Sequence, residues 1–362
     1  HENLRLRDDH LVATMDDWVA DKAAKQTGVK RSNETPPPIF TPYKLRGMLL
    51  ENRIAVSPMC MYSAEDGLIG DWHLVHLGSR AMGGAGLIMT ESTAISADGR
   101  ITPGCAGMYN DNHVAAWKRV VDFVHDNSYS KIGMQISHAG RKASTRLQWD
   151  GGEQAPLSSG AWDIISASPI SYSASNPTPK EMTEADMEDV LNDFVRAAGR
   201  ADKAGFDMLE LHCAHGYLLN TFISPKTNIR SDDYGGSLEN RLRYPLKVFE
   251  TIREKWPEQK PISVRISATD WIEEGITPQD AVEIARAFKN IGCDILDVSS
   301  GQVVSEEKPE YGRLFQLPFS DRIRLEAEIP TMTVGNIQSY ADANSIIASG
   351  RGDICVIARM HL

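Results

Sequence analysis

The sequence predicts an α/β protein built as a (β/α)8 TIM barrel, and three observations support this. The chain has 362 residues, which suits one barrel domain better than two ordinary domains. From residue 39 onwards, short runs rich in Val, Ile, Leu and Met alternate with longer stretches of helical periodicity. Eight such runs occur, and buried strands that alternate with helices are typical of parallel sheets. An open, doubly wound sheet is the alternative, but eight evenly recurring units favour a closed barrel.

The short apolar runs are the expected strands, and the expected helices lie between them. We predict strands at residues 54–59, 87–91, 131–136, 208–212, 262–266, 295–299, 331–334 and 354–357. The helical patterns are clearest at residues 114–126, 184–204, 238–256, 278–291 and 339–349. Start signals support three of these helices, because Thr183 and Ser237 suit N-cap positions and Pro278 suits a first turn.

The first 38 residues stand apart from the repeating pattern. Leu11, Met15, Trp18 and Val19 have helical spacing and predict one apolar face on a short helix. A polar stretch that ends in three prolines follows, as in a linker. We therefore expect an N-terminal helical extension and Pro-rich linker over residues 1–38.

The barrel is expected to span residues 39–362 and to carry one large insertion. Residues 145–182, rich in Ser and Pro, follow the third strand and predict a cap over the barrel mouth. The sequence begins without Met and stops just after the eighth strand. We therefore expect a piece of a longer protein, truncated before the last helix of the barrel.

Composition restricts the classes of partner. The net charge of −11 and the pI near 5.4 argue against nucleic acid and against an acidic membrane surface. The sequence has no apolar run of the roughly 18 residues that would span a bilayer and no signal-peptide pattern. The cysteines are scattered, without the spacing of a zinc or iron–sulfur site, and reduced thiols in the cytoplasm are the default interpretation. We therefore expect a cytoplasmic protein, and we expect its partner to be a small-molecule substrate. These cysteines are Cys60, Cys105, Cys213, Cys293 and Cys355.

The motif His212-Cys213-Ala214-His215-Gly216-Tyr217 follows the fourth predicted strand, where a barrel carries its catalytic groups. Two imidazoles three residues apart can both donate hydrogen bonds to one carbonyl oxygen and stabilise negative charge there. The nearby Tyr217 phenol can supply a proton. A pair of structural histidines and a metal site are the alternatives to this catalytic interpretation.

A metal site is the weaker alternative. Zinc hydrolases on this fold usually begin with His-x-His on the first strand, where this sequence has Ser57-Pro58-Met59-Cys60. His73 and His76 lie three apart in a helical pattern, but no further ligands accompany them, so packing is the preferred interpretation. We expect no bound metal.

Four motifs, in this order along the chain, resemble the Old Yellow Enzyme family over residues 39–362. They are Ser57-Pro58-Met59-Cys60-Met61-Tyr62, Gln135-Ile136-Ser137-His138-Ala139-Gly140-Arg141-Lys142, the His212 to Tyr217 segment, and Tyr234-Gly235-Gly236-Ser237-Leu238-Glu239-Asn240-Arg241. Cys60 and the His-x-x-His pair are similar to the thermophilic-like ene-reductase branch. More narrowly, the N-terminal extension and residues 70–78 resemble the reductase domains of 2-aminobenzoyl-CoA monooxygenase/reductases and of salicylyl-CoA 5-hydroxylases.

The resemblance implies FMN as the cofactor and NAD(P)H as the reductant. Gln135 would pair with the pyrimidine edge of the flavin, and Arg265 would stabilise the anionic reduced ring and raise its potential. Tyr62 would donate to the substrate from the side opposite the histidines. The other implied cofactor contacts are Ser57, Met59, Cys60 and Ser92 beside the ring, and Gly335, Asn336 and Arg359 at the phosphate.

The resemblance also implies an activity, the reduction of an activated C=C bond with NAD(P)H. It points to the reductase half of a bifunctional aryl-CoA monooxygenase/reductase, with a CoA thioester as substrate. Two alternatives stay open: a free-standing ene-reductase for small enones or quinones, and a non-catalytic dimerisation scaffold for a monooxygenase domain. We also expect a homodimer or a higher homo-oligomer.

Overall fold

A computed structural model describes residues 2–151 and 154–362. Eight parallel strands form a closed barrel, because β13 pairs with β3 and β4 also pairs with β6. This closure confirms the predicted TIM barrel and shows that the open-sheet alternative is wrong. The barrel strands are β3 (Ile54–Val56), β4 (Leu87–Met89), β6 (Lys131–Ser137), β9 (Met208–Cys213), β10 (Ile262–Ser267), β11 (Ile295–Ser299), β12 (Thr331–Thr333) and β13 (Ile354–Ile357).

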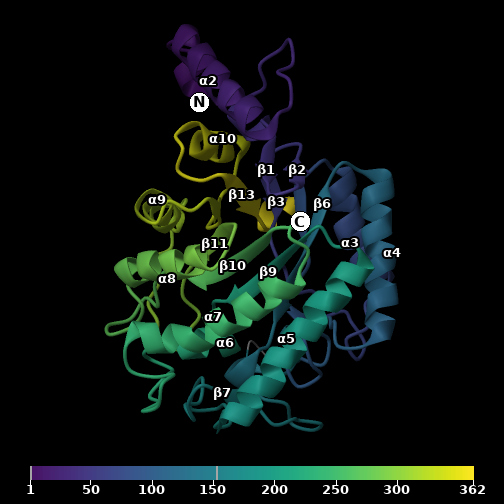
Figure 1. The fold of residues 1–362 in the computed structure, drawn as a ribbon, viewed down its shortest axis with the longest axis vertical. Helices are drawn as coiled ribbons and strands as arrows, with labels where there is room; N and C mark the ends of the chain where they lie inside the picture. Colours follow the sequence, from purple (N-terminus) through teal and green to yellow (C-terminus); the bar gives the residue numbers. More distant parts are fainter. Residues whose placement is uncertain (1, 152–153) are drawn as a thin grey trace.

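Helices surround the barrel, and their apolar faces form the main core against its outer side (Figure 1). The long helix α5 begins as predicted, with a capping box between Thr183 and Asp186. Thr277 and Pro278 start α8 in the same manner. The helices are α3 (Asp71–Met82), α4 (Asp111–Asn127), α5 (Glu184–Ala204), α6 (Leu218–Ile223), α7 (Leu238–Lys255), α8 (Pro278–Asn290), α9 (Leu317–Glu326) and α10 (Tyr340–Ala348).

Two strands end two or three residues earlier than predicted, each for a local reason. Strand β3 ends at Val56 because Ser57 makes the last ladder bond, to Ile357 O, and Pro58 has no N–H to donate. Strand β4 ends at Met89, Thr90 N makes one more backbone bond, to Gly133 O of β6, and regular pairing with β6 resumes at β5 (Thr93–Ala94). Between β4 and β5, Glu91 turns its carboxylate towards the loop that follows β3 and accepts from Met61 N.

A hairpin that the sequence did not indicate closes the barrel at the amino ends of its strands. Strands β1 (Tyr43–Leu45) and β2 (Met48–Leu50) pair antiparallel, and each is too short to show periodicity. Their apolar side chains pack with inward residues such as Met208 and Met332. Nearer the carboxyl ends of the strands, β6, β9, β10 and β11 carry polar inward residues instead. The barrel interior is therefore apolar at the hairpin end and polar near the mouth.

The N-terminal segment forms α1 (Glu2–Arg5) and α2 (Asp9–Thr27), and a 3-10 turn, η1 (Pro38–Phe40), leads into the barrel. Helix α2 contacts α10 and β1 at the hairpin end of the molecule (Figure 1). The predicted apolar face was partly wrong: Val19 is buried, but Leu11 and Trp18 are exposed. Helix α2 instead packs through Val12, Val19 and the small side chains of Ala20 and Ala23, because small residues allow its backbone to approach the barrel closely.

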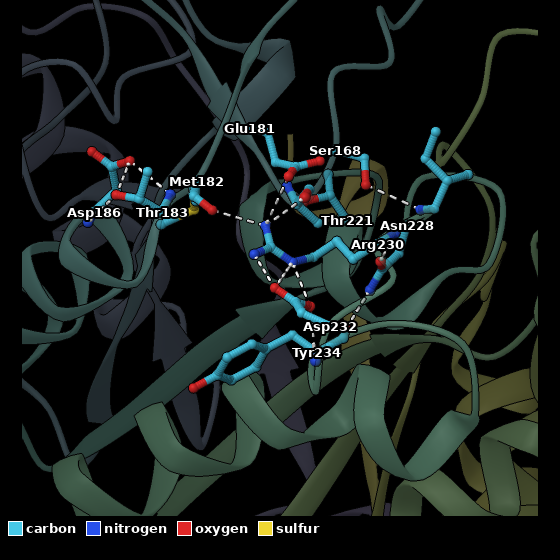
Figure 2. A network of polar contacts seen from close by, with 12 residues as sticks. Ser168, Glu181, Met182, Thr183, Asp186, Thr221, Asn228, Arg230, Asp232 and Tyr234 are labelled. Atoms are coloured by element: carbon cyan, nitrogen blue, oxygen red, sulfur yellow. Dashed lines mark hydrogen bonds and ion pairs between the residues drawn. The ribbon is translucent and has the colours of Figure 1, made fainter.

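The inserted segment lies at the opposite end, beside the barrel mouth (Figure 1). It contains η3 (Gln148–Asp150) and a small parallel pair, β7 (Ile165–Ser166) with β8 (Lys180–Glu181). Arg230, from the loop before α7, holds the base of this segment in the network of Figure 2. Its Nη1 donates to Ala167 O at 3.0 Å and to Met182 O at 2.8 Å, and Asp232 pairs with the guanidinium. The 228–237 loop is therefore architectural in this structure.

Within the two described ranges, no helix combines the length and the apolar character needed to cross a membrane.

Candidate active site

Three side chains of the His212–Tyr217 motif come together where β9 ends. The His212 ring centre lies 5.2 Å from that of His215 and 4.9 Å from that of Tyr217. The backbone N–H of Ala214 donates to His212 Nδ1 at 3.2 Å. The proton of a neutral His212 is therefore on Nε2, which can donate to a bound oxygen.

A tight turn places His215 over the strand ends. The backbone φ of His215 is +61° and that of Gly216 is +72°. A Cβ on Gly216 would lie 2.8 Å from Gln302 O, so this position requires glycine. The His215 N–H donates to Ser267 Oγ, and its Nε2 lies 2.7 Å from Ser299 Oγ. When Ser299 donates to Nε2, the His215 proton is on Nδ1.

Both imidazoles are held neutral. Burial lowers the pKa of His212 and of His215 well below the ordinary value, and the positive charges of Arg265 and Lys142 lower both further. Each ring then offers a single N–H donor at neutral pH. Two such donors suit a carbonyl oxygen that becomes negatively charged, and two cationic rings are not needed.

The predicted residues Cys60 and Tyr62 lie near Tyr217. Both pack with Tyr217 against a small apolar cluster that includes Cys105 and Ala139. Burial raises the pKa of the Tyr62 phenol, which therefore stays protonated and can donate. Burial and the Glu91 carboxylate raise the pKa of the Cys60 thiol, so it remains a thiol and does not act as a nucleophile.

Ser92 and Met59 are the other residues expected beside the flavin ring in this part of the chain. Ser92, directly before β5, is buried, and its backbone hydrogen bond lowers the pKa of the Cys60 thiol against the larger effect of burial. Met59 packs against the main core.

A cavity of 320 Å³ opens at the carboxyl ends of the barrel strands. It brings together five predicted cofactor contacts and adds Ser299 and Gln316, which the sequence had not indicated. Gly335 has φ of +106°, and a Cβ there would lie 2.7 Å from Gln316 Cβ, so the loop after β12 requires glycine. The five predicted residues in the cavity wall are Ser57, Arg265, Gly335, Asn336 and Arg359.

The Arg265 side chain fits a bound flavin at this cavity. The side chain is 10% exposed, and among the described residues its Nε has no hydrogen-bond partner. A buried guanidinium N–H without an acceptor is costly. The carbonyl and ring-nitrogen acceptors of a flavin would satisfy it. When bound, a flavin accepts hydride from a nicotinamide and passes it to a second substrate.

The sequence comparison decides the family. Residues 38–362 match the model of the NADH:flavin oxidoreductase / NADH oxidase family. The chain belongs to this family. It is 44% identical to an NADPH dehydrogenase of Geobacillus sp. (strain WCH70), over 89% of each chain. It is 40% identical to an NADH:flavin oxidoreductase of Gibberella zeae, over 89% of this chain and 82% of that one.

Solved structures agree with this Old Yellow Enzyme type of NADH:flavin oxidoreductase. Morphinone reductase superposes with a TM-score of 0.75 and 26% identity, over 91% of this chain and 87% of that chain. A 2-naphthoyl-CoA reductase shares the fold with a TM-score of 0.80 and 24% identity, over 89% of this chain and 50% of that chain. The chain is therefore a flavin-dependent oxidoreductase, and FMN and a nicotinamide are its cofactors.

Several polar residues of this oxidoreductase were missed from the sequence. Gln135 Nε2 donates to Glu210 Oε1 at 2.8 Å, so Glu210 fixes the orientation of the predicted flavin contact. Lys142 Nζ donates to His215 O and lies 5.2 Å from the centre of the Tyr217 ring. The signal for Glu210 was its inward position, two residues before His212 on one strand.

His73 and His76 are buried residues of α3. His73 Nε2 is 3.2 Å from Glu91 Oε1, both side chains are fully buried, and the His73 ring contacts Trp117 edge-on. Burial lowers the pKa of His76 to about 4. Over the described parts of the chain, no group of three or more His, Cys, Asp or Glu side chains is arranged to hold a metal ion.

Proposed function

We propose that this flavin oxidoreductase is an ene-reductase, which uses NAD(P)H to reduce a C=C bond conjugated to a carbonyl group. The observation that carries the proposal is the pair of buried, neutral imidazoles of His212 and His215, whose ring centres lie 5.2 Å apart beside Arg265. Neutral N–H donors polarise the carbonyl oxygen without needing a charged partner. This makes the β-carbon a better hydride acceptor.

Each residue of the site has a proposed role. His212 and His215 hold the substrate oxygen, and Tyr217 gives a proton to the α-carbon. Tyr62 donates to the substrate from the side opposite the histidines. Gln135 and Arg265 hold the pyrimidine end of FMN. The proposed contacts at the rest of the cofactor are Ser57, Met59, Cys60, Ser92, Gly335, Asn336 and Arg359.

The role of Tyr217 gives a direct test of this chemistry. We expect Tyr217→Phe to leave the bleaching of bound flavin by NADPH unchanged, because no proton is needed there. Reoxidation by an enone should slow by roughly 10²–10⁴-fold, the usual contribution of a general acid. Tyr129→Phe, at a tyrosine that is 86% exposed, is the matched control. Equal reoxidation rates in both variants would remove Tyr217 from the proton transfer.

We further propose that the physiological substrate is a dearomatised aryl-CoA thioester, supplied by a monooxygenase domain of the same protein. The family model begins at residue 38, whereas α2 lies before it and packs on the barrel. Most of the stability of such a helix comes from packing its apolar face on a neighbouring surface, and such a docked segment suits a junction between two domains. A dearomatised intermediate could rearomatise if released, so a linked reductase has a purpose.

The full reading frame, together with an assay of its product with aryl-CoA, oxygen and NADH, tests this refinement. We expect consumption of NADH in both steps. A product inert towards CoA thioesters would leave the free-standing ene-reductase for small enones or quinones. The scaffold alternative is disfavoured because the site residues form an ordered, hydrogen-bonded set. Failure to take up any flavin would favour it.

A further inference from the structure

A buried polar layer inside the barrel includes Gln135 and Arg265, two of the residues proposed to hold the flavin. Gln135 of β6 is in register with Glu210 of β9, and Arg265 of β10 is in register with Asp297 of β11. All four residues are at most 8% exposed. The layer therefore places two carboxyl groups and one guanidinium inside the barrel.

The two carboxyl groups have different partners. Asp297 Oδ2 lies 3.3 Å from Arg265 Nη1, so Asp297 has the cation beside it. Glu210 receives only neutral donors, Gln135 Nε2 at 2.8 Å and Ser263 Oγ at 2.9 Å. One cation cannot compensate two buried carboxylates, and burial of an uncompensated charge is expensive. The neutral surroundings select Glu210 as the group to remain uncharged.

We propose that Glu210 is a positioning residue that works as a neutral carboxylic acid, fixing the Gln135 amide while Arg265 is neutralised by Asp297 alone. This inference rests on the proposed flavin site, because Gln135 and Arg265 matter only if they face that cofactor. The local hydrogen bonds suit a protonated Glu210. Its Oε2–H can donate to Ser263 Oγ, and the Ser263 hydroxyl hydrogen can turn to Leu209 O at 3.4 Å.

The electrostatic surroundings agree with a protonated Glu210. Burial, followed by the negative charge of Asp297, raises the pKa of Glu210 to about 8, against the opposing effect of Arg265. The charged or titratable groups facing it are Asp297 from β11, Arg265 from β10 and the Cys293 thiol before β11. Strand β6 contributes only the uncharged Gln135.

A proton on Glu210 has a consequence for the flavin. With Glu210 neutral, Asp297 is the one carboxylate of this layer that offsets the positive charge of Arg265. Arg265 therefore stabilises an anionic reduced ring better than it would with a second carboxylate in the layer. Loss of the proton would add a negative charge to the layer. It would lower the midpoint potential of the bound flavin by about 30 mV for each tenfold loss of stabilisation of the two-electron reduced form.

The test compares Glu210→Gln with Asp297→Asn in the flavin-loaded enzyme. A glutamine amide reproduces the hydrogen bonds of a protonated Glu210. We therefore expect Glu210→Gln to keep the wild-type midpoint potential at neutral pH, to within about 30 mV, which corresponds to a tenfold change in the stabilisation of the reduced flavin. Asp297→Asn removes the carboxylate that neutralises Arg265 and should shift the potential to more positive values. Glu210→Ala should weaken FMN binding because the Gln135 amide loses its acceptor, and Glu210→Gln should restore that binding.

The pH dependence separates the two protonation states. Towards alkaline pH, the wild-type potential should fall more steeply than that of Glu210→Gln, because only the wild type loses this proton. The infrared C=O band of a buried, protonated carboxyl should be present in flavin-free wild type at neutral pH and absent from Glu210→Gln. If Asp297→Asn does not fold, these two comparisons suffice.

The inference is overturned if Glu210→Gln raises the potential at neutral pH, or if the carboxyl band is missing from the wild type. Either result would mean that Glu210 is ionised. Failure of the proposed function looks different, because a wild-type chain that binds no flavin has no potential to measure, whereas the infrared band can still be recorded.

Discussion

At the scale of single residues, the site depends on how two histidines three apart can face the same point. His212 lies on the strand, whereas His215 lies on a turn with left-handed backbone angles at His215 and Gly216. The turn returns the second ring over the barrel, where Ser299 holds its Nε2. The His-x-x-His spacing works because Gly216 allows this turn.

Replacing both histidines by alanine should abolish ligand binding but leave FMN in place. Loss of an oxyanion donor typically costs about 3 kcal/mol of transition-state stabilisation, roughly a hundredfold in rate. Phenolic ligands that mimic the enolate should perturb the flavin spectrum in the wild type and not in His212→Ala/His215→Ala. His10→Ala, at an exposed position on α2, is the control. An unchanged titration in the double variant would refute the assigned role.

At the scale of elements, the Arg230 network fixes the inserted segment to the barrel. Arg230→Met removes the donors to Ala167 O and Met182 O. Each buried carbonyl left without a partner costs about 1–3 kcal/mol. We expect faster proteolysis within residues 145–182 and a lower free energy of unfolding. Arg196→Met, on the exposed face of α5, should change neither, and equal proteolysis of both variants would contradict the role of Arg230.

The start of α5 predicts a defined pH effect. The Lys180 ammonium and the Thr183 N–H hold the pKa of Asp186 at about 2, below its ordinary 3.8. A depressed carboxyl pKa contributes stability above the unfolded value and loses it as pH falls through the folded one. Asp186→Ala should therefore cost about 1 kcal/mol at neutral pH, and the difference should vanish near pH 2. The exposed Asp189→Ala is the control, and a difference that persists in acid would contradict this account.

Strand and helix positions could be read from the sequence because their periodicity and caps are local signals. Strands β11 and β13 and helix α5 have the predicted bounds. The β1–β2 hairpin could not be predicted, because three-residue strands carry no period. The face of α2 was misjudged because hydrophobicity favoured Trp18, whereas the packing surface favours small side chains. Asp297 was missed because its importance comes from register with Arg265 on the neighbouring strand, which no single segment reveals. The position of Glu210 two residues before His212 indicated an inward side chain, but its partner Gln135 lies on another strand.

At the scale of the whole molecule, the barrel separates structural and chemical tasks along its axis. The hairpin and the apolar part of the interior close one end, and the polar layer with the histidines occupies the other. The inserted segment borders that polar end, and the N-terminal helix packs at the hairpin end (Figure 1). The chemistry thus lies at the carboxyl ends of the strands, where a barrel can vary its loops without disturbing its core.

The most direct test of the central claim is an anaerobic two-step titration of the purified protein. We predict a yellow protein with one non-covalent FMN per chain, bleached by NADPH and restored to yellow by an α,β-unsaturated ketone. Arg265→Ala should bind FMN more weakly or lower its potential. A colourless protein that takes up no FMN at micromolar concentration, or a reduced flavin that the ketone does not reoxidise, would contradict the account.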